Sequence, residues 1–122
     1  QVQENIATAG KYTTGCLTED EKEMIQKLRS FYKSRMKADC TGCRYCNGCP
    51  QIIPIPSIFK YYNEAFMYGD VAACRKKYRT NIKNKFKADQ CTGCGQCEEH
   101  CPQNLEIRAL LREAHAFLMA ED

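Results

Sequence analysis

Eight of the ten cysteines in this 122-residue chain fall in two short groups. The first group reads Cys40-Thr-Gly-Cys43-Arg-Tyr-Cys46-Asn-Gly-Cys49-Pro, and the second reads Cys91-Thr-Gly-Cys94-Gly-Gln-Cys97-Glu-Glu-His-Cys101-Pro. A loop with cysteines at consecutive two-residue gaps can turn three sulfurs toward one centre. Disulfide frameworks instead spread their cysteines along the chain, because each bridge has to close a loop. The spacing therefore indicates metal centres and not a disulfide scaffold.

The order of the cysteines also separates the candidate metals. Zinc sites usually draw their ligands from separated pairs, such as two C-x2-C pairs roughly 15–20 residues apart. Three closely spaced cysteines followed shortly by a Cys-Pro pair are typical of iron–sulfur proteins, in which the fourth cysteine binds the other cluster. Because this pattern occurs twice, we expect two [4Fe–4S] clusters. A structural or regulatory iron–sulfur or zinc module without electron transfer is the alternative.

The crossed pattern predicts which cysteines bind each cluster. The first cluster is expected to be bound by Cys40, Cys43, Cys46 and Cys101. The second is expected to be bound by Cys91, Cys94, Cys97 and Cys49. Each cluster would then take ligands from both halves of the chain, so folding should depend on cluster assembly.

The two cysteine groups belong to an internal repeat. Lys37-Ala38-Asp39 precedes the first group and Lys87-Ala88-Asp89 precedes the second, and both groups end in Cys-Pro-Gln. Each group then leads into an apolar segment, which starts near Ile55 in the first half and near Ile107 in the second. We expect two pseudo-symmetric cluster-binding halves.

The flanking segments show the apolar period of helices. Thr18 and Glu21 form a capping box, Ser57 is a possible N-cap of a helix that ends at Gly69, and Asp70 can cap the next helix. Each of these helices, and a further one at the C-terminus, has one apolar face. The face of the helix after Thr18 comprises Met24, Ile25, Leu28, Phe31 and Tyr32, and that of the helix after Ser57 comprises Ile58, Phe59, Tyr62, Ala65 and Phe66. The face of the helix after Asp70 comprises Val71, Cys74 and Tyr78, and that of the C-terminal helix comprises Ile107, Leu110, Leu111, Ala114 and Leu118. Few segments alternate as strands do. We therefore expect an all-α, helical ferredoxin-like domain.

Composition and charge exclude several classes of protein. No run approaches the roughly 18 apolar residues of a membrane span, so we expect no membrane span. The formal net charge is +3, but two oxidised clusters with four thiolates each would add about −4, which argues against a nucleic-acid partner. Thiolates and clusters persist in a reducing compartment, so we expect a cytoplasmic protein.

The residues outside the two groups allow more than one interpretation. Seven cations between residues 75 and 87 either form a docking face for an acidic redox protein or simply face solvent. Tyr45 and Phe59 are expected to shield the clusters from water. We interpret Cys74 as a buried thiol, Cys16 as a linker thiol, and His100 and His115 as exposed.

The two cysteine groups, together with Ile55-Pro56-x-Ile58-Phe59 and Tyr62-Asn63-Glu64 between them, resemble the C-terminal ferredoxin domain of a subgroup of bacterial and archaeal aldo/keto reductases. The resemblance covers residues 1–118. Residues 1–6 resemble the start of the last barrel helix of that family, where a Glu-Asn pair, here Glu4-Asn5, helps bind NADP(H). For this chain we prefer to interpret Glu4 and Asn5 as an exposed helix start.

The resemblance implies that the chain is part of a longer oxidoreductase. Residues 1–36 would be the tail of a barrel plus a linker helix, and residues 37–122 would be the two-cluster domain. The catalytic Tyr, Lys, Asp and His of that family would lie upstream, so no catalytic residue is assigned here. NADP(H) would bind only in the full-length parent. The expected partner is the barrel itself or a separate redox protein.

Overall fold

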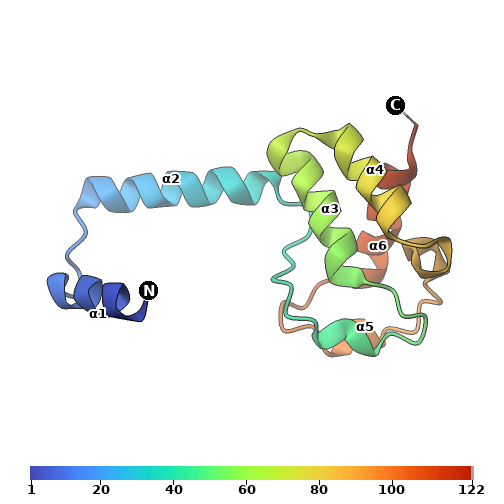
Figure 1. The fold of residues 1–122 in the computed structure, drawn as a ribbon, viewed down its shortest axis with the longest axis horizontal. Helices are drawn as coiled ribbons and strands as arrows, with labels where there is room; N and C mark the ends of the chain where they lie inside the picture. The colour runs from blue at the N-terminus through green and yellow to red at the C-terminus, as the bar shows by residue number, and fades with distance from the viewer. Residues whose placement is uncertain (122) are drawn as a thin grey trace. The chain divides into compact units, whose positions relative to one another are not determined.

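The computed structural model describes residues 1–121 of the chain (Figure 1). Within these residues every regular element is a helix, which confirms the expected all-α fold. The α-helices are α1 (Val2–Lys11), α2 (Glu19–Arg35), α3 (Ile55–Tyr68), α4 (Val71–Asn81), α5 (Gln96–Glu99) and α6 (Ile107–Met119). Three 3-10 helices complete the set: η1 (Tyr45–Gly48), η2 (Asn84–Phe86) and η3 (Ala88–Gln90).

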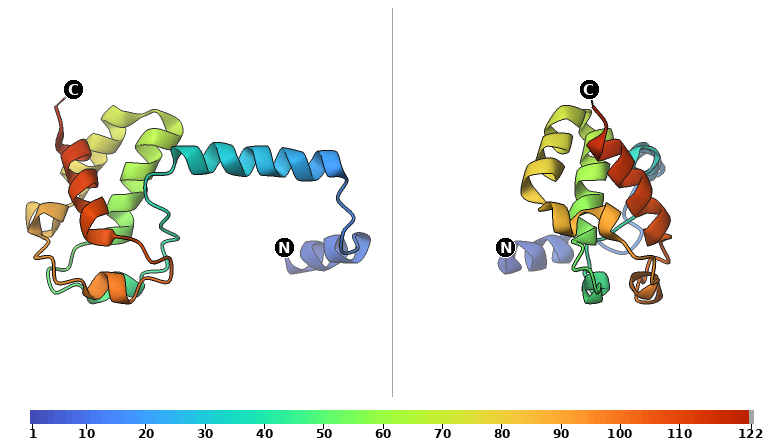
Figure 2. Two further views of the ribbon diagram at one scale, coloured as in Figure 1. Left: turned by 180° about the vertical axis from the view of Figure 1, so that it is seen from behind. Right: turned by 90° about the vertical axis from the view of Figure 1, so that its right-hand side faces the viewer.

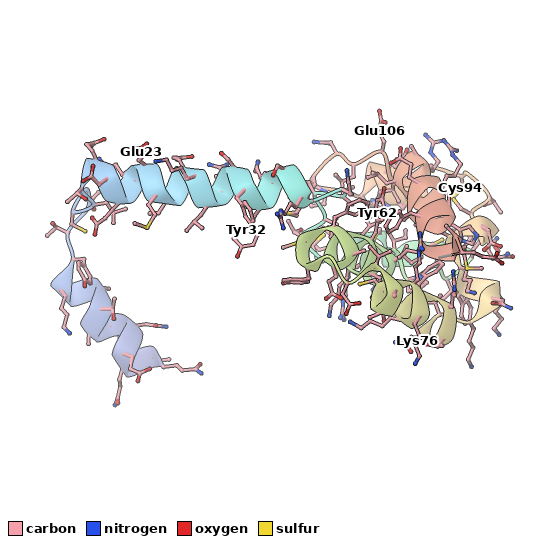
Figure 3. All side chains as sticks on the ribbon, turned by 90° about the horizontal axis from the view of Figure 1, so that it is seen from above. Glu23, Tyr32, Tyr62, Lys76, Cys94 and Glu106 are labelled. Carbon is pink, nitrogen blue, oxygen red and sulfur yellow. The ribbon has the colours of Figure 1, made fainter. Side chains whose placement is uncertain are left out.

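The chain divides into two compact units, residues 1–34 and residues 35–122. The first unit contains α1 and nearly all of α2. The predicted capping box starts α2: the Thr18 backbone N–H donates to Glu21 Oε2 at 2.8 Å, and the Glu21 N–H donates to Thr18 Oγ1 at 3.3 Å. The apolar residues of α2 are all exposed, and Figure 3 shows Tyr32 pointing away from the helix axis. Neither α1 nor α2 has a buried residue.

The second unit is built around α3, α4 and α6, which pack against one another (Figure 1). Burial of the apolar faces of these helices supplies the main driving force for this packing. The buried apolar residues on these three helices are Ile55, Ile58, Phe59, Tyr62, Ala65, Cys74, Tyr78, Ile107, Leu111, Ala114 and Leu118. The predicted core faces are therefore confirmed, with Phe66, Val71 and Leu110 only partly buried at their edges. Tyr62, Phe66 and Phe117 form an aromatic cluster between α3 and α6, with ring centroids 4.7–5.6 Å apart. Figure 3 shows Tyr62 inside the packed helices.

The observed boundaries of α3 and α4 agree with those predicted from the sequence, except at the start of α3. Gly69 ends α3 with a left-handed φ of 74°, and the Asp70 side chain caps α4 by accepting the Ala73 N–H at 3.2 Å. The Ser57 prediction is wrong: α3 begins at Ile55, and Ser57 lies inside its first turn. Pro56 at the second helical position explains the earlier start. Proline is favourable in the first turn of a helix, because the N–H groups there have no acceptor within the helix and the N–H that proline lacks is not needed.

The two halves of this unit repeat each other beyond the cysteines. Ile52 and Asn104 lie at matching places after the last cysteine of each group, and both have left-handed backbones with φ of 54° and 51°. Their N–H groups donate to the carbonyls of Cys49 and Cys101 at 2.9 and 3.0 Å. Each group then leads directly into a helix, α3 or α6. The structure confirms two pseudo-symmetric halves.

Side chains of the packed helices hold both Lys-Ala-Asp segments: a residue of α3 holds the first, and residues of α4 and α6 together hold the second. In the first half, Asn63 Oδ1 accepts the N–H groups of Lys37 and Ala38 at 2.9 Å, and Asn63 Nδ2 donates to the Ala38 carbonyl at 2.7 Å. In the second half, His115 takes the place of Asn63. It reaches the segment through Tyr78, whose hydroxyl lies 2.7 Å from His115 Nδ1 and accepts the Ala88 N–H at 3.1 Å.

From the sequence we expected His115 to be an exposed helix residue, and this expectation is wrong. Only 24% of its side chain is exposed, and its ring stacks edge-on against Tyr78. Its Nδ1 also lies 3.9 Å from an Asp89 carboxylate oxygen. The expectation failed because the partner, Tyr78, is far away in sequence.

Among the described residues, no helix is both long and apolar enough to cross a membrane.

Candidate metal centre

Both cysteine groups lie at the same end of the second unit. Figure 2 shows η1, in the first group, beside α5, in the second, below the helices α3 and α6. Gly42 and Gly93, at matching positions in the two groups, have left-handed φ of 72° and 74°. An L side chain rarely adopts this backbone, so glycine allows each loop to turn directly after its first cysteine.

The first cavity lies between the first cysteine group and the segment after the second. Its wall contains the thiols of Cys40, Cys43, Cys46 and Cys101, which are the four cysteines predicted for the first cluster. About 330 Å³ of atom-free space lies there, including space open to solvent. The remaining wall is mostly apolar, with Ile55, Phe59, Leu105 and Ile107 on it.

The second cavity reproduces the first with the two halves exchanged. Its wall contains Cys49, Cys91, Cys94 and Cys97, which are the four cysteines predicted for the second cluster. Its atom-free space, again including space open to solvent, is about 320 Å³, so the two cavities are almost equal in size. The structure thus brings each predicted set of four together, although the cysteines come from sequence positions up to 61 apart, as between Cys40 and Cys101.

One residue belongs to the walls of both cavities. Ile55, the first residue of α3, is only 1% exposed and lines the first and the second cavity alike. The two cavities are therefore separated in part by a single aliphatic side chain.

The thiols differ in their exposure to solvent. Cys43 and Cys94, the middle cysteines of the two triplets, are exposed, whereas Cys97 is 8% exposed. Figure 3 shows Cys94 near the edge of the unit. Each cavity thus has one exposed cysteine, and its other cysteines are at least half covered.

Burial makes several of these thiols poor acids in the absence of metal. Loss of hydration raises the pKa of Cys40 and of Cys46 above its ordinary value, and neighbouring cysteines add to this effect. Burial, followed by the charge of Glu98, raises the pKa of Cys97 to about 11. Because metal binding requires thiolates, loading these cavities must release protons.

One member of a charged pair lies on the wall of the second cavity. Arg108, at the start of α6, lines this cavity and holds Glu98 of α5. Its Nε donates to Glu98 Oε2 at 2.9 Å, its Nη2 lies 2.8 Å from the same oxygen, and its backbone N–H donates to Glu98 Oε1 at 2.8 Å. The Arg108 Nη1 also donates to the Gly93 carbonyl at 3.3 Å. The pair therefore ties α6, α5 and the cysteine loop together.

The remaining sequence predictions near the site have mixed outcomes. Phe59 is buried and lines the first cavity, as expected of a residue that excludes water. Tyr45 also lines that cavity but is 67% exposed, so it covers the site incompletely. Cys74 is buried in α4, away from both cavities, and Cys16 is exposed. Glu4 and Asn5 are exposed on α1, where Glu4 lies in the first turn.

Three of the seven cations in the basic run, Arg75, Arg79 and Lys87, have a structural use. Arg75 Nε donates to the Phe117 carbonyl at 3.1 Å, and Arg79 Nη2 donates to the carbonyls of Met119 and Ala120 at 3.2 and 2.5 Å. These bonds satisfy carbonyls at the end of α6, which have no partner within the helix. Lys87 is buried, with its ammonium group over the Tyr78 ring. The cations that remain exposed include Lys76, which Figure 3 shows pointing away from the unit.

Sequence reasoning missed the groups that support the site. Arg108, Glu98 and Asn63 were assigned no role, and Tyr78 was placed only in the core, since each acts through a partner that only the fold brings close. One signal was available for Arg108. It stands where the first half has Pro56, so the repeat departs from its own pattern at this position.

The donor set fits an iron–sulfur cluster. Among the described residues, no group of three or more His, Cys, Asp or Glu side chains is placed so as to hold a single metal ion. Each cavity nonetheless presents four cysteines and neither His, Asp nor Glu on its wall. Four thiolates are the usual ligand set of a [4Fe–4S] cluster.

The fold and its cysteine-lined cavities define a small helical ferredoxin-like domain. Comparison with known families agrees, since the 4Fe-4S dicluster domain family matches residues 39–106, which is more than half of the chain. The chain belongs to this family, and its cysteines are those of an iron–sulfur protein. Searches of curated proteins and of solved structures found no match.

Proposed function

We propose that this chain transfers electrons through two [4Fe–4S] clusters. The observation that supports this most strongly is the pair of matching cavities, each lined by four cysteines drawn from both halves. The proposed ligands are Cys40, Cys43, Cys46 and Cys101 for one cluster, and Cys91, Cys94, Cys97 and Cys49 for the other. Each cluster, when bound, would accept and release single electrons.

The residues around the cavities have definite tasks in this function. The cysteines bind, the apolar wall residues exclude water, and Ile55 lies between the two centres. Burial on one side and an exposed cysteine on the other give each centre a protected interior and a route to partners. Electrons would enter or leave near Cys43 or Cys94, since these are the exposed ligands.

We also propose that the chain is the ferredoxin-like C-terminal part of an aldo/keto reductase-type oxidoreductase, and that it works in the cytoplasm. The support is the resemblance of its motifs, which extends over residues 1–118. In such a parent, NADP(H) would bind to the barrel and exchange two electrons as hydride, whereas the clusters exchange one at a time. A group that splits the pair, such as a flavin, would be needed between them. The coding sequence upstream of Gln1 tests this parentage, because it encodes a barrel or it does not.

Reductive titration with EPR tests the electron-transfer function. The anaerobically purified chain should be reduced by dithionite to a state with EPR signals, and a one-electron acceptor should then reoxidise it without loss of iron. Persistence of the iron through repeated cycles is the expected result. A chain whose clusters cannot be reduced, or are lost on the first cycle, would instead support a structural or regulatory module.

A further inference from the structure

The second cavity carries a fixed ion pair that the first cavity lacks. Glu98 follows Cys97 directly, and the matching place after Cys46 holds the neutral Asn47. Arg108 matches Pro56, which has no charge either. The two halves therefore place the same thiols and similar apolar walls around the two cavities. Arg44 is a cation on the wall of the first cavity, whereas Arg108, on the wall of the second, is joined to the anion Glu98.

The geometry holds both charges in place. Three contacts of 2.8–2.9 Å join Arg108 to Glu98, and a fourth joins Arg108 to the Gly93 carbonyl between Cys91 and Cys94. Gly95 lies beside this arrangement with a left-handed φ of 84°, and a Cβ there would make only an ordinary contact with Arg108 Cζ, at 3.9 Å. The first half has Arg44 at the place of Gly95.

Both charges act on the thiols of the second cavity. Arg108 lines the cavity wall itself, and Glu98 is half-buried beside Cys97. Both charges therefore lie next to proposed ligands of the second cluster, Arg108 on the cavity wall and Glu98 directly after Cys97.

We propose that Glu98 and Arg108 set the reduction potential of the second centre separately from that of the first. This inference rests on the proposed binding of two clusters. Reduction adds a negative charge to the centre, so a nearby cation favours the reduced form and a nearby anion disfavours it. Arg108 and Glu98 therefore act in opposite directions on the same centre, and Arg108 is a positioning residue as well, because it fixes the carboxylate.

Opposite substitutions test the proposal on the intact, cluster-loaded chain. In a potentiometric titration followed by EPR, Arg108→Gln should lower the potential of one centre, and Glu98→Gln should raise the potential of the same centre. A change of about tenfold in the reduction equilibrium, or about 59 mV for one electron, is expected for each variant. The other centre should keep its wild-type potential in both.

Two further variants separate charge from structure. Arg112→Gln removes an exposed cation one turn along α6 that is absent from the cavity wall, and it should shift the potential less than Arg108→Gln does. Arg108→Lys keeps the charge but cannot form the same forked contact, and it should restore the potential toward the wild-type value. Iron content is measured in every variant, so that loss of a cluster is distinguished from a shift.

The outcomes are distinct. Opposite shifts confined to one centre, with recovery in Arg108→Lys, support the proposal. Shifts of the same sign in Arg108→Gln and Glu98→Gln, or an Arg108→Lys potential equal to that of Arg108→Gln, would overturn it and leave the proposed function intact. A wild-type chain that holds fewer than two clusters would overturn both.

Discussion

Asn63 and Tyr78 are the side chains that fix the backbone just ahead of the two cysteine groups. Asn63 is buried and accepts two N–H groups while donating one of its own. Tyr78, which is fully buried, does the corresponding work for Ala88 with one hydroxyl. Neither residue lines either of the two four-cysteine cavities, yet each holds the backbone where the following loop begins.

Asn63→Ala should destabilise the cluster-loaded chain strongly. The substitution leaves the N–H groups of Lys37 and Ala38 without a partner in or near the core, which should cost about 3 kcal/mol of unfolding free energy. Chemical denaturation measures this loss. Ser57→Ala, at an exposed position on the same helix, is the control and should change stability little. Equal effects of the two would contradict the role given to Asn63.

Tyr78 should make stability depend on alkaline pH. Burial, together with the charge of Asp89, raises the pKa of Tyr78 above its ordinary value of 10.0, although the bond from the Ala88 N–H acts the other way. A phenol whose folded pKa is raised stabilises the fold below pH about 10, and this contribution is lost as the pH rises through the folded pKa. Melting curves at increasing pH above 9 should therefore show a steeper loss for the wild type than for Tyr78→Phe. If the stability of the wild type and of Tyr78→Phe fell equally with rising pH, the role given to the Tyr78 hydroxyl would be wrong.

The metal-binding pattern could be recognised from the sequence because the spacing within each cysteine group is a local property. The structure places the eight cysteines on the walls of two cavities, in the two sets of four that the crossed pattern predicts, and their roles as ligands stay predictions. His115 and Arg108 could not be assigned in this way, since their roles depend on Tyr78 and Glu98, which only folding brings near.

At the scale of elements, helices could be predicted from the sequence where a capping residue or a helical repeat of apolar residues is present. The Thr18–Glu21 box, the Gly69 stop and the Asp70 cap all have local hydrogen-bond or backbone reasons, and all are present. The start of α3 was misplaced because Ser57 resembles an N-cap, whereas the proline at the second helical position decides the boundary. The use of arginines from α4 to complete the end of α6 was not visible, as it joins two separate helices.

The contact between α4 and α6 predicts that part of the basic run is needed for stability. Arg79→Met should lower the unfolding free energy by about 1 kcal/mol, because the carbonyls of Met119 and Ala120 lose their donor. Lys76→Met removes a charge of the same sign from the exposed side of α4 and should leave stability nearly unchanged. Thermal melts of both variants make the comparison. Similar melting temperatures would show that Arg79 is only a surface charge.

At the scale of the whole molecule, the account depends on the exchange of ligands between the two halves. Cys101 lies on the wall of the first cavity and Cys49 on that of the second, so neither half encloses four cysteines alone. The helices α3 and α6 start directly after these cysteines and pack on each other. Loss of either crossed ligand should therefore affect the opposite cysteine group.

Paired cysteine substitutions test the exchange. Cys101→Ser should abolish the same EPR signal as Cys43→Ser, and Cys49→Ser should abolish the same signal as Cys94→Ser, because these pairs share a cavity. Each variant should keep the other signal and about four irons. If Cys101→Ser instead matches Cys94→Ser, each half binds its own cluster and the crossed arrangement is wrong.

The most direct test of the central claim is the iron and acid-labile sulfide content of the chain purified without oxygen. Two [4Fe–4S] clusters predict about eight irons and about eight sulfides per chain, in a brown protein. About four irons would mean that only one cavity is loaded. A colourless protein with two zinc ions and no sulfide would contradict the account altogether.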